Sequence, residues 1–371
     1  MHCDAPLPDG VVPPRTERQL EVVMQEAPTP FVSVILPCRN ESRYIARCLD
    51  SVFANDYPSG AFEVLVADGR SDDGTREILD DYARMHPNLK VLDNPQRITP
   101  CALNTAIRAA RGEIIVRVDA HVLYPATYIR QLVDALIETG AESVGGVIRT
   151  IPAADTAMAR AVAIGMSHPF GFGDSHFRIG SSVRREVDHV PFFCCRRTVF
   201  DRIGLFDEEL VRNQDGEFSW RLRASGGRIM LIPEISSSYF ARDTIGKLAR
   251  MMFQYGYFKP LTIRKIGRAV TARQFAPSLL VLSLALSLSA SPWSGTARLA
   301  FAGVSIAYIA AVLMAAGRTL RTHPPTVAGA LLAVFPAMHF SYGYGFVRRW
   351  VELAVGAKQE QRDRALVPLT R

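Results

Sequence analysis

The feature that most constrains this chain is a set of three long uncharged runs near its C-terminus. No Asp, Glu, Lys or Arg occurs in residues 274–297, 299–317 or 322–347. A helix that crosses a bilayer needs about 20 predominantly apolar residues, and each run is close to that length or longer. Soluble domains rarely place three such runs back to back, so buried core helices are the less favoured alternative. We therefore predict two to three transmembrane helices in residues 274–347.

The charges around these runs predict which way the chain faces. Arg264, Lys265, Arg268 and Arg273 directly precede the first run, and positive residues mark the cytoplasmic flank of a membrane helix. Three full passes would carry the basic tail, residues 348–371, to the opposite side against the same rule. We therefore favour two full passes and an interfacial or re-entrant third run. The expectation is a multi-pass inner-membrane protein whose N-terminal part stays in the cytoplasm.

Composition narrows the class of protein further. The chain has 371 residues, 48% of them hydrophobic, and its 43 Lys plus Arg against 36 Asp plus Glu give a net charge of +7. This mild basic surplus suits a membrane surface or a phosphate-bearing ligand, and no basic block interleaved with aromatics indicates nucleic-acid binding. The six cysteines lack CxxC spacing, which disfavours a zinc site and favours a reducing compartment.

Residues 31–243 alternate short apolar runs with amphipathic stretches. This pattern predicts an open, mostly parallel, Rossmann-like α/β sheet with helices on both faces. The predicted strands are residues 32–36, 62–66, 89–92 and 113–118. Ligands bind such sheets at the carboxyl ends of the strands. Polar residues gather there in three groups, namely Arg39-Asn-Glu41, Asp68 to Thr75 and Asp119-Ala-His121.

Missing motifs exclude several enzyme classes. The sequence has no G-x-G-x-x-G after its first strand, no G-x-x-x-x-G-K-[ST] and no G-x-S-x-G. A nicotinamide dehydrogenase, a P-loop NTPase and a serine hydrolase are therefore disfavoured. Carboxylates at the sheet edge would repel a phosphate unless a divalent cation lay between them. Asp119 and His121 offer one oxygen and one nitrogen ligand, which suits Mn²⁺ or Mg²⁺ completed by phosphate oxygens and water.

Taken in order, the motifs resemble those of family 2 inverting glycosyltransferases with the GT-A fold. They are Pro37-x-Arg39-Asn40-Glu41, Asp68 to Thr75, Asp119-Ala-His121 and Asn213-Gln-Asp215. The stretches Arg117–His121 and Asn213–Arg221 are similar to the exopolysaccharide (succinoglycan-type) glucosyltransferases. The resemblance covers about residues 31–260.

The resemblance implies roles for the residues that match these motifs. The donor-nucleotide contacts would be Pro37, Arg39, Glu41, Asp68 and Asp119. Asp68 would hydrogen-bond the uracil, and Asp119 with His121 would hold Mn²⁺ or Mg²⁺ on the diphosphate of a UDP-sugar. Asp215 would be the general base. The chain departs from the family twice: an imidazole replaces the second carboxylate of the DxD pattern, and Gln-Asp replaces Glu-Asp, which leaves one carboxylate for the base.

Further candidates rest on weaker signals. Arg97 and Asn104 would contact the diphosphate, with a solvated charge and a loop cap as their respective alternatives. Gln214, Arg221 and Gln254 are candidates for the acceptor side. Gln254 stands where related membrane transferases carry a Gln-x-x-Arg-Trp element.

These observations lead to one leading hypothesis for function. A hexose, glucose by resemblance, would pass from a UDP-sugar to a lipid-linked (polyprenyl-diphosphate) saccharide in exopolysaccharide or cell-envelope glycan synthesis, beside other glycan-assembly enzymes. Two alternatives stay open, namely transfer to polyprenyl phosphate itself and a non-catalytic UDP-sugar-binding scaffold. Asp215 argues against the scaffold, because binding alone needs no base. The predicted parts are a flexible tail (1–30), a cytoplasmic catalytic domain (31–243), an amphipathic interface segment (244–273), the membrane region (274–347) and a basic tail (348–371).

Overall fold

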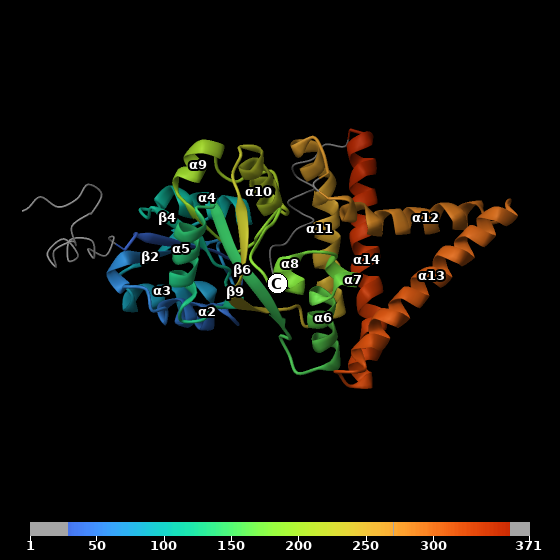
Figure 1. Cartoon of the computed structure of the whole chain (residues 1–371), viewed down its shortest axis with the longest axis horizontal. Helices are drawn as coiled ribbons and strands as arrows, with labels where there is room; N and C mark the ends of the chain where they lie inside the picture. Colours follow the sequence, from blue (N-terminus) through green and yellow to red (C-terminus); the bar gives the residue numbers. More distant parts are fainter. Residues whose placement is uncertain (1–28, 270, 357–371) are drawn as a thin grey trace, which may run out of the picture. The chain divides into compact units, whose positions relative to one another are not determined.

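The computed structural model describes residues 29–269 and 271–356. Most of the predicted N-terminal tail, with Cys3, and most of the basic C-terminal tail lie outside the described residues. The described part contains a nine-stranded sheet in the order β3-β2-β1-β4-β8-β6-β9-β5, with β7 paired to β9 (Figure 1). The strands are β1 Val32–Cys38, β2 Phe62–Asp68, β3 Leu89–Asp93, β4 Ile114–Arg117, β5 Val122–Leu123, β6 Ser143–Ile151, β7 Arg185–Glu186, β8 Phe193–Arg196 and β9 Ile229–Phe240.

The four predicted strands form the parallel half of the sheet. β3, β2, β1 and β4 are neighbours, and all three of their pairings are parallel, so their carboxyl ends meet at one edge. The later strands depart from this pattern. β8 runs antiparallel to both β4 and β6, whereas β6 and β9 are parallel. The complete sheet is therefore mixed, and its parallel half is the part that the polar motifs follow.

Alternation along β1 creates a hydrophobic core on each face of the sheet. Val34 and Leu36 belong to one core and Ile35 to the other, and all three are fully buried. Leu49 packs in the first core and Leu103 in the second. The covering helices are α2 Ile45–Phe53, α3 Thr75–Met85, α4 Thr99–Ala109, α5 Tyr128–Thr139, α9 Thr198–Ile203 and α10 Gln214–Ala224. Helices on both faces explain why these strands read as continuous apolar runs.

Three helices near the C-terminus are long and apolar enough to cross a membrane. They span Ala272–Ala290, Gly295–Thr319 and Pro325–Ala354; the first joins a 3₁₀ turn to α12 (Ala276–Ala290), and the others are α13 and α14. The third run, for which an interfacial or re-entrant path is predicted, forms one continuous helix with Pro336 inside it. It also continues past residue 347, the predicted end of the membrane region.

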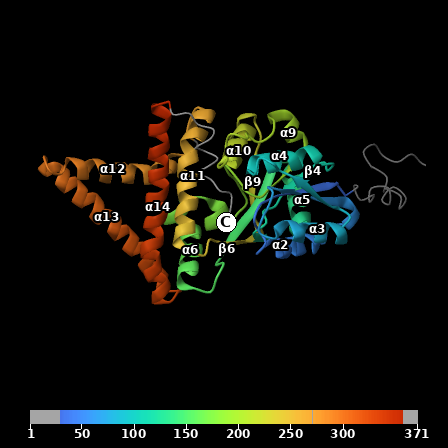
Figure 2. The same cartoon turned by 180° about the vertical axis from the view of Figure 1, so that it is seen from behind.

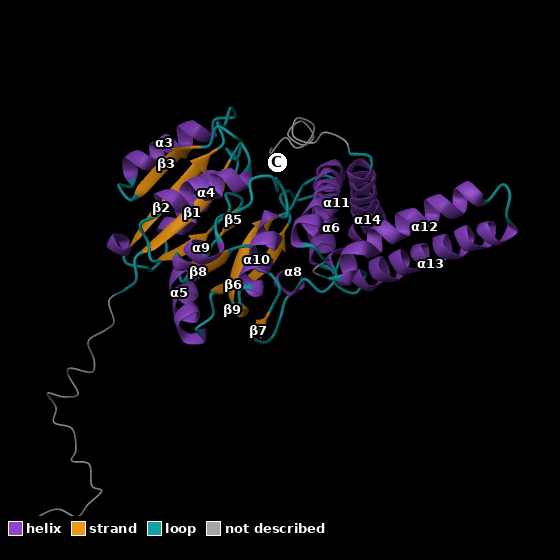
Figure 3. Cartoon of the chain, turned by 90° about the horizontal axis from the view of Figure 1, so that it is seen from above, coloured by secondary structure: helices purple, strands orange, loops and turns teal. Residues whose placement is uncertain are grey.

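The helix α11 (Ile245–Ile266) occupies the segment predicted to be amphipathic. It runs beside α14, and the two lie between the sheet and the α12–α13 hairpin (Figures 2 and 3). The approach is close: a Cβ on Gly256 would overlap the carbonyl of Tyr342, and one on Gly345 would overlap the carbonyl of Phe253. The remaining helices, α6 Ala157–Ser167, α7 Pro169–Phe172 and α8 His176–Ile179, lie next to this pair. The packing brings the candidate membrane helices beside the edge at which the parallel strands end.

Candidate active site

A cavity of about 730 Å³ lies at the carboxyl ends of the parallel strands. Its walls come from the ends of β1 and β4, from the start of α10, and from α11 to α14. Eight predicted site residues line it, namely Pro37, Arg39, Glu41, Arg97, Asp119, His121, Gln214 and Asp215. Motifs far apart in the sequence therefore converge on one site, as the positions of the strand ends predict.

The predicted metal ligands lie together just after β4. Nδ1 of His121 is 2.9 Å from Oε1 of Glu41. This contact orients the ring in the way that carboxylates orient metal-binding histidines. Asp119 accepts a hydrogen bond of 3.2 Å from Nε of Arg117, and its backbone N–H donates to Oη of Tyr124 at 2.8 Å. Both ligands are thus held in place by buried or half-buried partners.

The number and type of these side chains indicate which cation site they fit. The described residues contain no group of three or more His, Cys, Asp or Glu side chains that could hold a metal ion by themselves. Asp119 and His121 instead fit a cation that takes its other ligands from phosphate oxygens and water. With Nδ1 turned to Glu41, the ring would meet such a cation through Nε2. Arg39 and Arg97 line the same cavity and carry the charge that a diphosphate needs.

The helix α10 presents Asp215 to the cavity from its first turn. Asn213 precedes the helix in the left-handed conformation, with φ of 64°, and its side-chain amide donates to the carbonyl of Tyr255 at 3.2 Å. Oδ1 of Asp215 accepts a 2.8 Å hydrogen bond from the Gly216 N–H. Its Oδ2 lies 3.5 Å from Nε2 of His189. The N-terminal end of a helix favours negative charge, so this position stabilises the carboxylate.

The charged surroundings keep Asp215 ionised. Burial works to raise the pKa of Asp215, but His189, Arg117 and Lys259 outweigh it and hold the pKa below the usual value of a carboxyl. Burial lowers the pKa of His189, and the nearby carboxylates of Asp215 and Asp188 oppose that effect; Nδ1 of His189 lies 3.0 Å from Oγ of Ser219. An ionised carboxylate in a partly enclosed site is suited to accept a proton as a general base.

The other carboxylates that line the cavity are less suited to that task. Glu41 contacts His121, and Asp119 is paired with Arg117. Asp188 lies 3.7 Å from a guanidinium nitrogen of Arg273. Within the described lining, Asp215 is therefore the best placed base.

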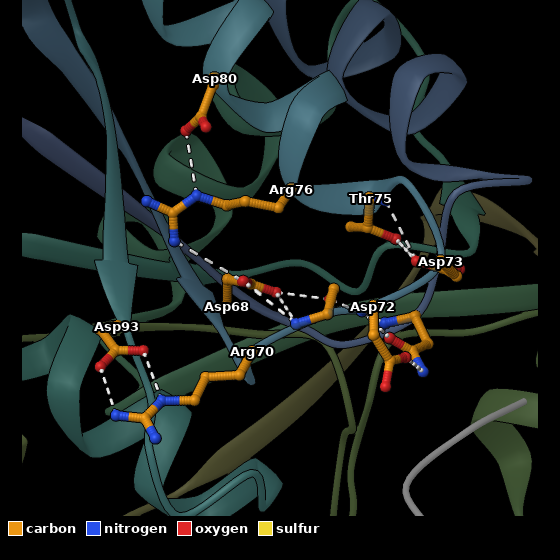
Figure 4. Close-up of polar contacts among 10 residues, drawn as sticks. Asp68, Arg70, Asp72, Asp73, Thr75, Arg76, Asp80 and Asp93 are labelled. Carbon is orange, nitrogen blue, oxygen red and sulfur yellow. Dashed lines mark hydrogen bonds and ion pairs between the residues drawn. The ribbon is translucent and has the colours of Figure 1, made fainter.

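Asp68 ends β2 and is buried, but its carboxylate serves the loop that follows it (Figure 4). Oγ of Ser71 donates to its Oδ1 at 2.5 Å, and a guanidinium nitrogen of Arg76 lies 3.7 Å from its Oδ2. Further along, Asp73 accepts from the Thr75 N–H at 3.1 Å, at the start of α3. Asp68 lies outside the cavity lining, and its described partners belong to the loop that follows it. The uracil contact of Asp68 stays a prediction.

Asn104, a candidate for the diphosphate, lies outside the cavity and holds a loop instead. Its Nδ2 donates to the carbonyl of Phe206 at 2.9 Å and to Oε1 of Glu208 at 2.8 Å. Its Oδ1 accepts from the Phe206 N–H at 2.9 Å. These bonds occupy the amide in the loop-capping role, which is the alternative that the sequence leaves open.

We expect Asn104→Ala to destabilise the protein without weakening nucleotide binding. The substitution leaves buried groups of the Phe206 peptide units without partners, and each such loss costs about 1–3 kcal/mol. Thermal unfolding of the detergent-solubilised chain should show a Tm lowered by several degrees, with UDP affinity unchanged. Weaker UDP binding at an unchanged Tm would instead indicate that Asn104 contacts the donor nucleotide.

The predicted acceptor residues Arg221 and Gln254 do not line the cavity. Arg221 pairs with Glu217 at 2.6 Å and donates to the carbonyl of Leu205 at 2.7 Å, which braces the turn after α9. Gln254 is buried and accepts from Nε of Arg212 at 3.2 Å. Because Arg212 lines the cavity, Gln254 acts on the site through it.

Several residues that line the cavity are absent from the sequence prediction. They are Arg178, His189, Arg212, Arg242 and Lys259. Arg212 directly precedes the Asn-Gln-Asp motif, and that position is a signal by which it could be found. The others stand in loops or short helices, or on α11, and they belong to no motif. Only the folded chain brings them to Asp215.

Comparison with known proteins agrees with this geometry. A model described as glycosyl transferase family 2 matches residues 33–204. The succinoglycan biosynthesis protein ExoA of Rhizobium meliloti (strain 1021) is 29% identical over 324 residues, covering 86% of this chain and 94% of that protein. The dolichyl N-acetyl-alpha-D-glucosaminyl phosphate 3-beta-D-2,3-diacetamido-2,3-dideoxy-beta-D-glucuronosyltransferase of Methanococcus voltae is 28% identical, covering 63% of this chain and 74% of that protein.

A solved structure shares the fold. The mannosyltransferase PcManGT from Pyrobaculum calidifontis, in complex with GDP-Man and Mn²⁺, aligns with a TM-score of 0.52 at 24% identity, over 89% of this chain and 88% of that one. Residues 33–204 therefore carry a glycosyl transferase family 2 domain, the chain shares the GT-A fold, and it is a glycosyltransferase.

Proposed function

We propose that this glycosyltransferase is membrane-bound and inverting, and that it moves a hexose, with glucose favoured, from a UDP-sugar to a lipid-linked saccharide. The acceptor would be a polyprenyl-diphosphate saccharide of exopolysaccharide or cell-envelope glycan synthesis, met at the cytoplasmic face of the inner membrane. One observation carries the proposal: a single cavity holds the ionised Asp215, the Asp119–His121 pair and apolar residues of the candidate membrane helices. A relative named for succinoglycan biosynthesis and one named for a dolichyl-linked sugar phosphate support a lipid-linked acceptor.

The chemistry follows from the position of Asp215. Its carboxylate would take the proton of the acceptor hydroxyl as that oxygen attacks the anomeric carbon from the side opposite UDP. One displacement inverts the anomeric configuration, so an α-linked donor gives a β-glycoside. A base in hydrogen-bond reach of the hydroxyl typically contributes 10²–10⁴-fold to the rate. The Gly216 N–H and the start of α10 keep the carboxylate ionised and fixed for that transfer.

The donor side would be formed by the other predicted residues of the cavity. Asp119 and His121 would hold a divalent cation, with His121 oriented by Glu41. When bound, such a cation stabilises the negative charge that builds on the leaving diphosphate. Pro37 and Arg39, at the end of β1, would contact the nucleotide.

The base also favours a hydroxyl acceptor over the alternative of polyprenyl phosphate. A phosphate oxygen is already an anion at neutral pH and needs no base to become a nucleophile. An ionised Asp215 beside it would repel it. Transfer to a sugar hydroxyl uses the carboxylate and avoids that repulsion.

The test uses membranes from cells that express the chain, supplied with labelled UDP-glucose and Mn²⁺. We expect label to enter the organic-extractable fraction, and EDTA to prevent it. Membranes from cells with an empty vector give the background. Chromatography against a polyprenyl-phosphate glucose standard separates the proposed product, a longer saccharide on a diphosphate, from transfer to polyprenyl phosphate.

Each other outcome changes a defined part of the proposal. Label that enters only from a different UDP-sugar would correct the donor. Label in the polyprenyl-phosphate product would show that polyprenyl phosphate is the acceptor in place of the lipid-linked saccharide. If no label entered the organic-extractable fraction from any UDP-sugar, even with lipid-linked glycans added, the transferase proposal would be wrong for these substrates.

A further inference from the structure

Four cations line the cavity that also holds Asp215. They are Arg178 of α8, Arg212 before α10, Arg242 after β9 and Lys259 of α11, and we call them the cation cluster. Burial and the nearby charge of Arg242 lower the pKa of Arg212, which reflects how close these groups lie. None of the four forms an ion pair with another described residue, whereas Arg117 in the same cavity is paired with Asp119. The cluster therefore carries more positive charge than the described protein neutralises.

Part of this charge is buried. Only 9% of Arg178 is exposed, and one terminal nitrogen of Arg178 and one of Arg242 are buried without hydrogen-bond partners among the described residues. The Arg178 guanidinium lies 4.8 Å from the ring centroid of Phe172 and 5.0 Å from that of Tyr239. The rings hold the guanidinium in place but supply no counter-charge. Because a buried cation without a counter-charge is costly, this part of the cavity suits an anionic ligand.

The far part of the same cavity is largely apolar and is built by the candidate membrane helices. Leu280 of α12, Tyr308 of α13, and Met338 and Tyr342 of α14 line it. A ligand that filled both parts would have an anionic head on the cation cluster and an apolar chain along these helices. That combination is the chemistry of a lipid phosphate.

We propose that the cation cluster binds the phosphate groups of the lipid acceptor, whose apolar chain lies against α12, α13 and α14. This inference rests on the proposed function, and it adds the residues that recognise the acceptor. Guanidinium groups suit the task because they bind phosphate oxygens through two parallel hydrogen bonds. The saccharide on the diphosphate would then place its hydroxyl at Asp215.

The donor diphosphate is the competing occupant of the cluster. Its expected partners are different residues, namely Asp119 and His121 after β4, with Arg39 after β1. The cluster instead comes from elements that follow β6 in the chain. A decisive experiment therefore fills the donor site before the lipid is added.

The test measures binding of farnesyl diphosphate to the full-length chain in detergent, with UDP and Mn²⁺ at saturation. We expect farnesyl diphosphate to bind at least tenfold more tightly than farnesol, which has only the apolar chain, or inorganic diphosphate, which has only the anionic group. Arg242→Gln and Lys259→Gln should each raise its Kd about tenfold, as expected for the loss of one charged hydrogen bond. Arg264→Gln, an exposed charge on the same helix as Lys259, should leave the Kd unchanged.

Three results would overturn the inference. Displacement of farnesyl diphosphate by UDP would place it in the donor site. An unchanged Kd in both cluster variants, with UDP affinity normal, would remove the cluster from lipid binding. Equal affinity for phosphatidylglycerol would make the cluster a general contact for anionic headgroups.

The binding measurement also separates this inference from the proposed function, because it requires no transfer. Farnesyl diphosphate bound through the cluster by a chain that transfers no sugar would refute the proposed activity and keep the lipid site. Sugar transfer with a normal acceptor KM in both cluster variants would keep the activity and refute the lipid site.

Discussion

Asp215→Asn should abolish sugar transfer while leaving UDP binding intact. The amide keeps the shape of the side chain, and its oxygen can still accept from the Gly216 N–H, so α10 should begin as before. It cannot take the proton of the acceptor hydroxyl, and the loss of a general base typically costs 10²–10⁴-fold in kcat. Initial rates with labelled UDP-glucose measure the loss, and calorimetric titration of UDP measures the retained affinity.

A second carboxylate in the same cavity provides the matched control. Asp188 lines the cavity and faces Arg273 at 3.7 Å, so Asp188→Asn should change kcat far less than Asp215→Asn. An inactive Asp188→Asn beside an active Asp215→Asn would transfer the role of base to Asp188. Full activity in both variants would leave the mechanism without a carboxylate base.

The parallel half of the sheet could be predicted because its signals are local. The strand expected at residues 32–36 is β1, Val32–Cys38, and it reads as apolar because helices cover both of its faces. The end of each such strand also fixes where its polar motif lies. Glu41, Asp119 and His121 therefore meet in one cavity although β1 and β4 are far apart in the sequence.

The hydrogen-bond partners of individual polar side chains could not be predicted in this way. Asn104 suits a phosphate by its chemistry, but its partner Phe206 is 102 residues away in the chain. Asp68 likewise suits a base edge, and its carboxylate is taken by Ser71 and Arg76. A residue type states what a side chain can bind, and only the fold decides which partner reaches it first.

The position of the helices that form the cavity wall opposite the sheet could not be predicted from the sequence either. The presence of α12 and α14 follows from composition, since α12 lies within the first uncharged run and α14 covers most of the third. Their place beside the site depends on α11 packing against α14 at Gly256 and Gly345, where a side chain would not fit. Lys259 comes near Asp215 because α11 also packs against the start of α10, where Asn213 donates to the carbonyl of Tyr255. No motif could mark it.

Removal of the divalent cation should stop transfer as completely as removal of the base. The cation would stabilise charge on the leaving diphosphate, a contribution of several kcal/mol that corresponds to about 10²-fold or more in rate. We therefore expect EDTA to abolish activity and excess Mn²⁺ to restore it. Asp119→Asn should lower kcat by a similar factor, because an amide oxygen carries no charge for the cation. Activity that survives both EDTA and Asp119→Asn would exclude a cation from the mechanism.

The imidazole at position 121 should also decide which cation works best. Mg²⁺ prefers oxygen ligands more strictly than Mn²⁺ does, so the wild-type chain should be faster with Mn²⁺. His121→Asp would supply a second oxygen ligand, but Glu41 lies 2.9 Å from Nδ1 of His121 and two carboxylates that close repel each other. The sharper variant is therefore His121→Asp combined with Glu41→Gln, for which the ratio of the Mn²⁺ rate to the Mg²⁺ rate should fall severalfold. Glu41→Gln alone should raise the Mn²⁺ concentration needed for half-maximal rate by about 10–100-fold, as the loss of an orienting carboxylate does. If the metal ratio of the double variant matched that of the wild type, His121 would not be a ligand and the cation would depend on Asp119 and the diphosphate.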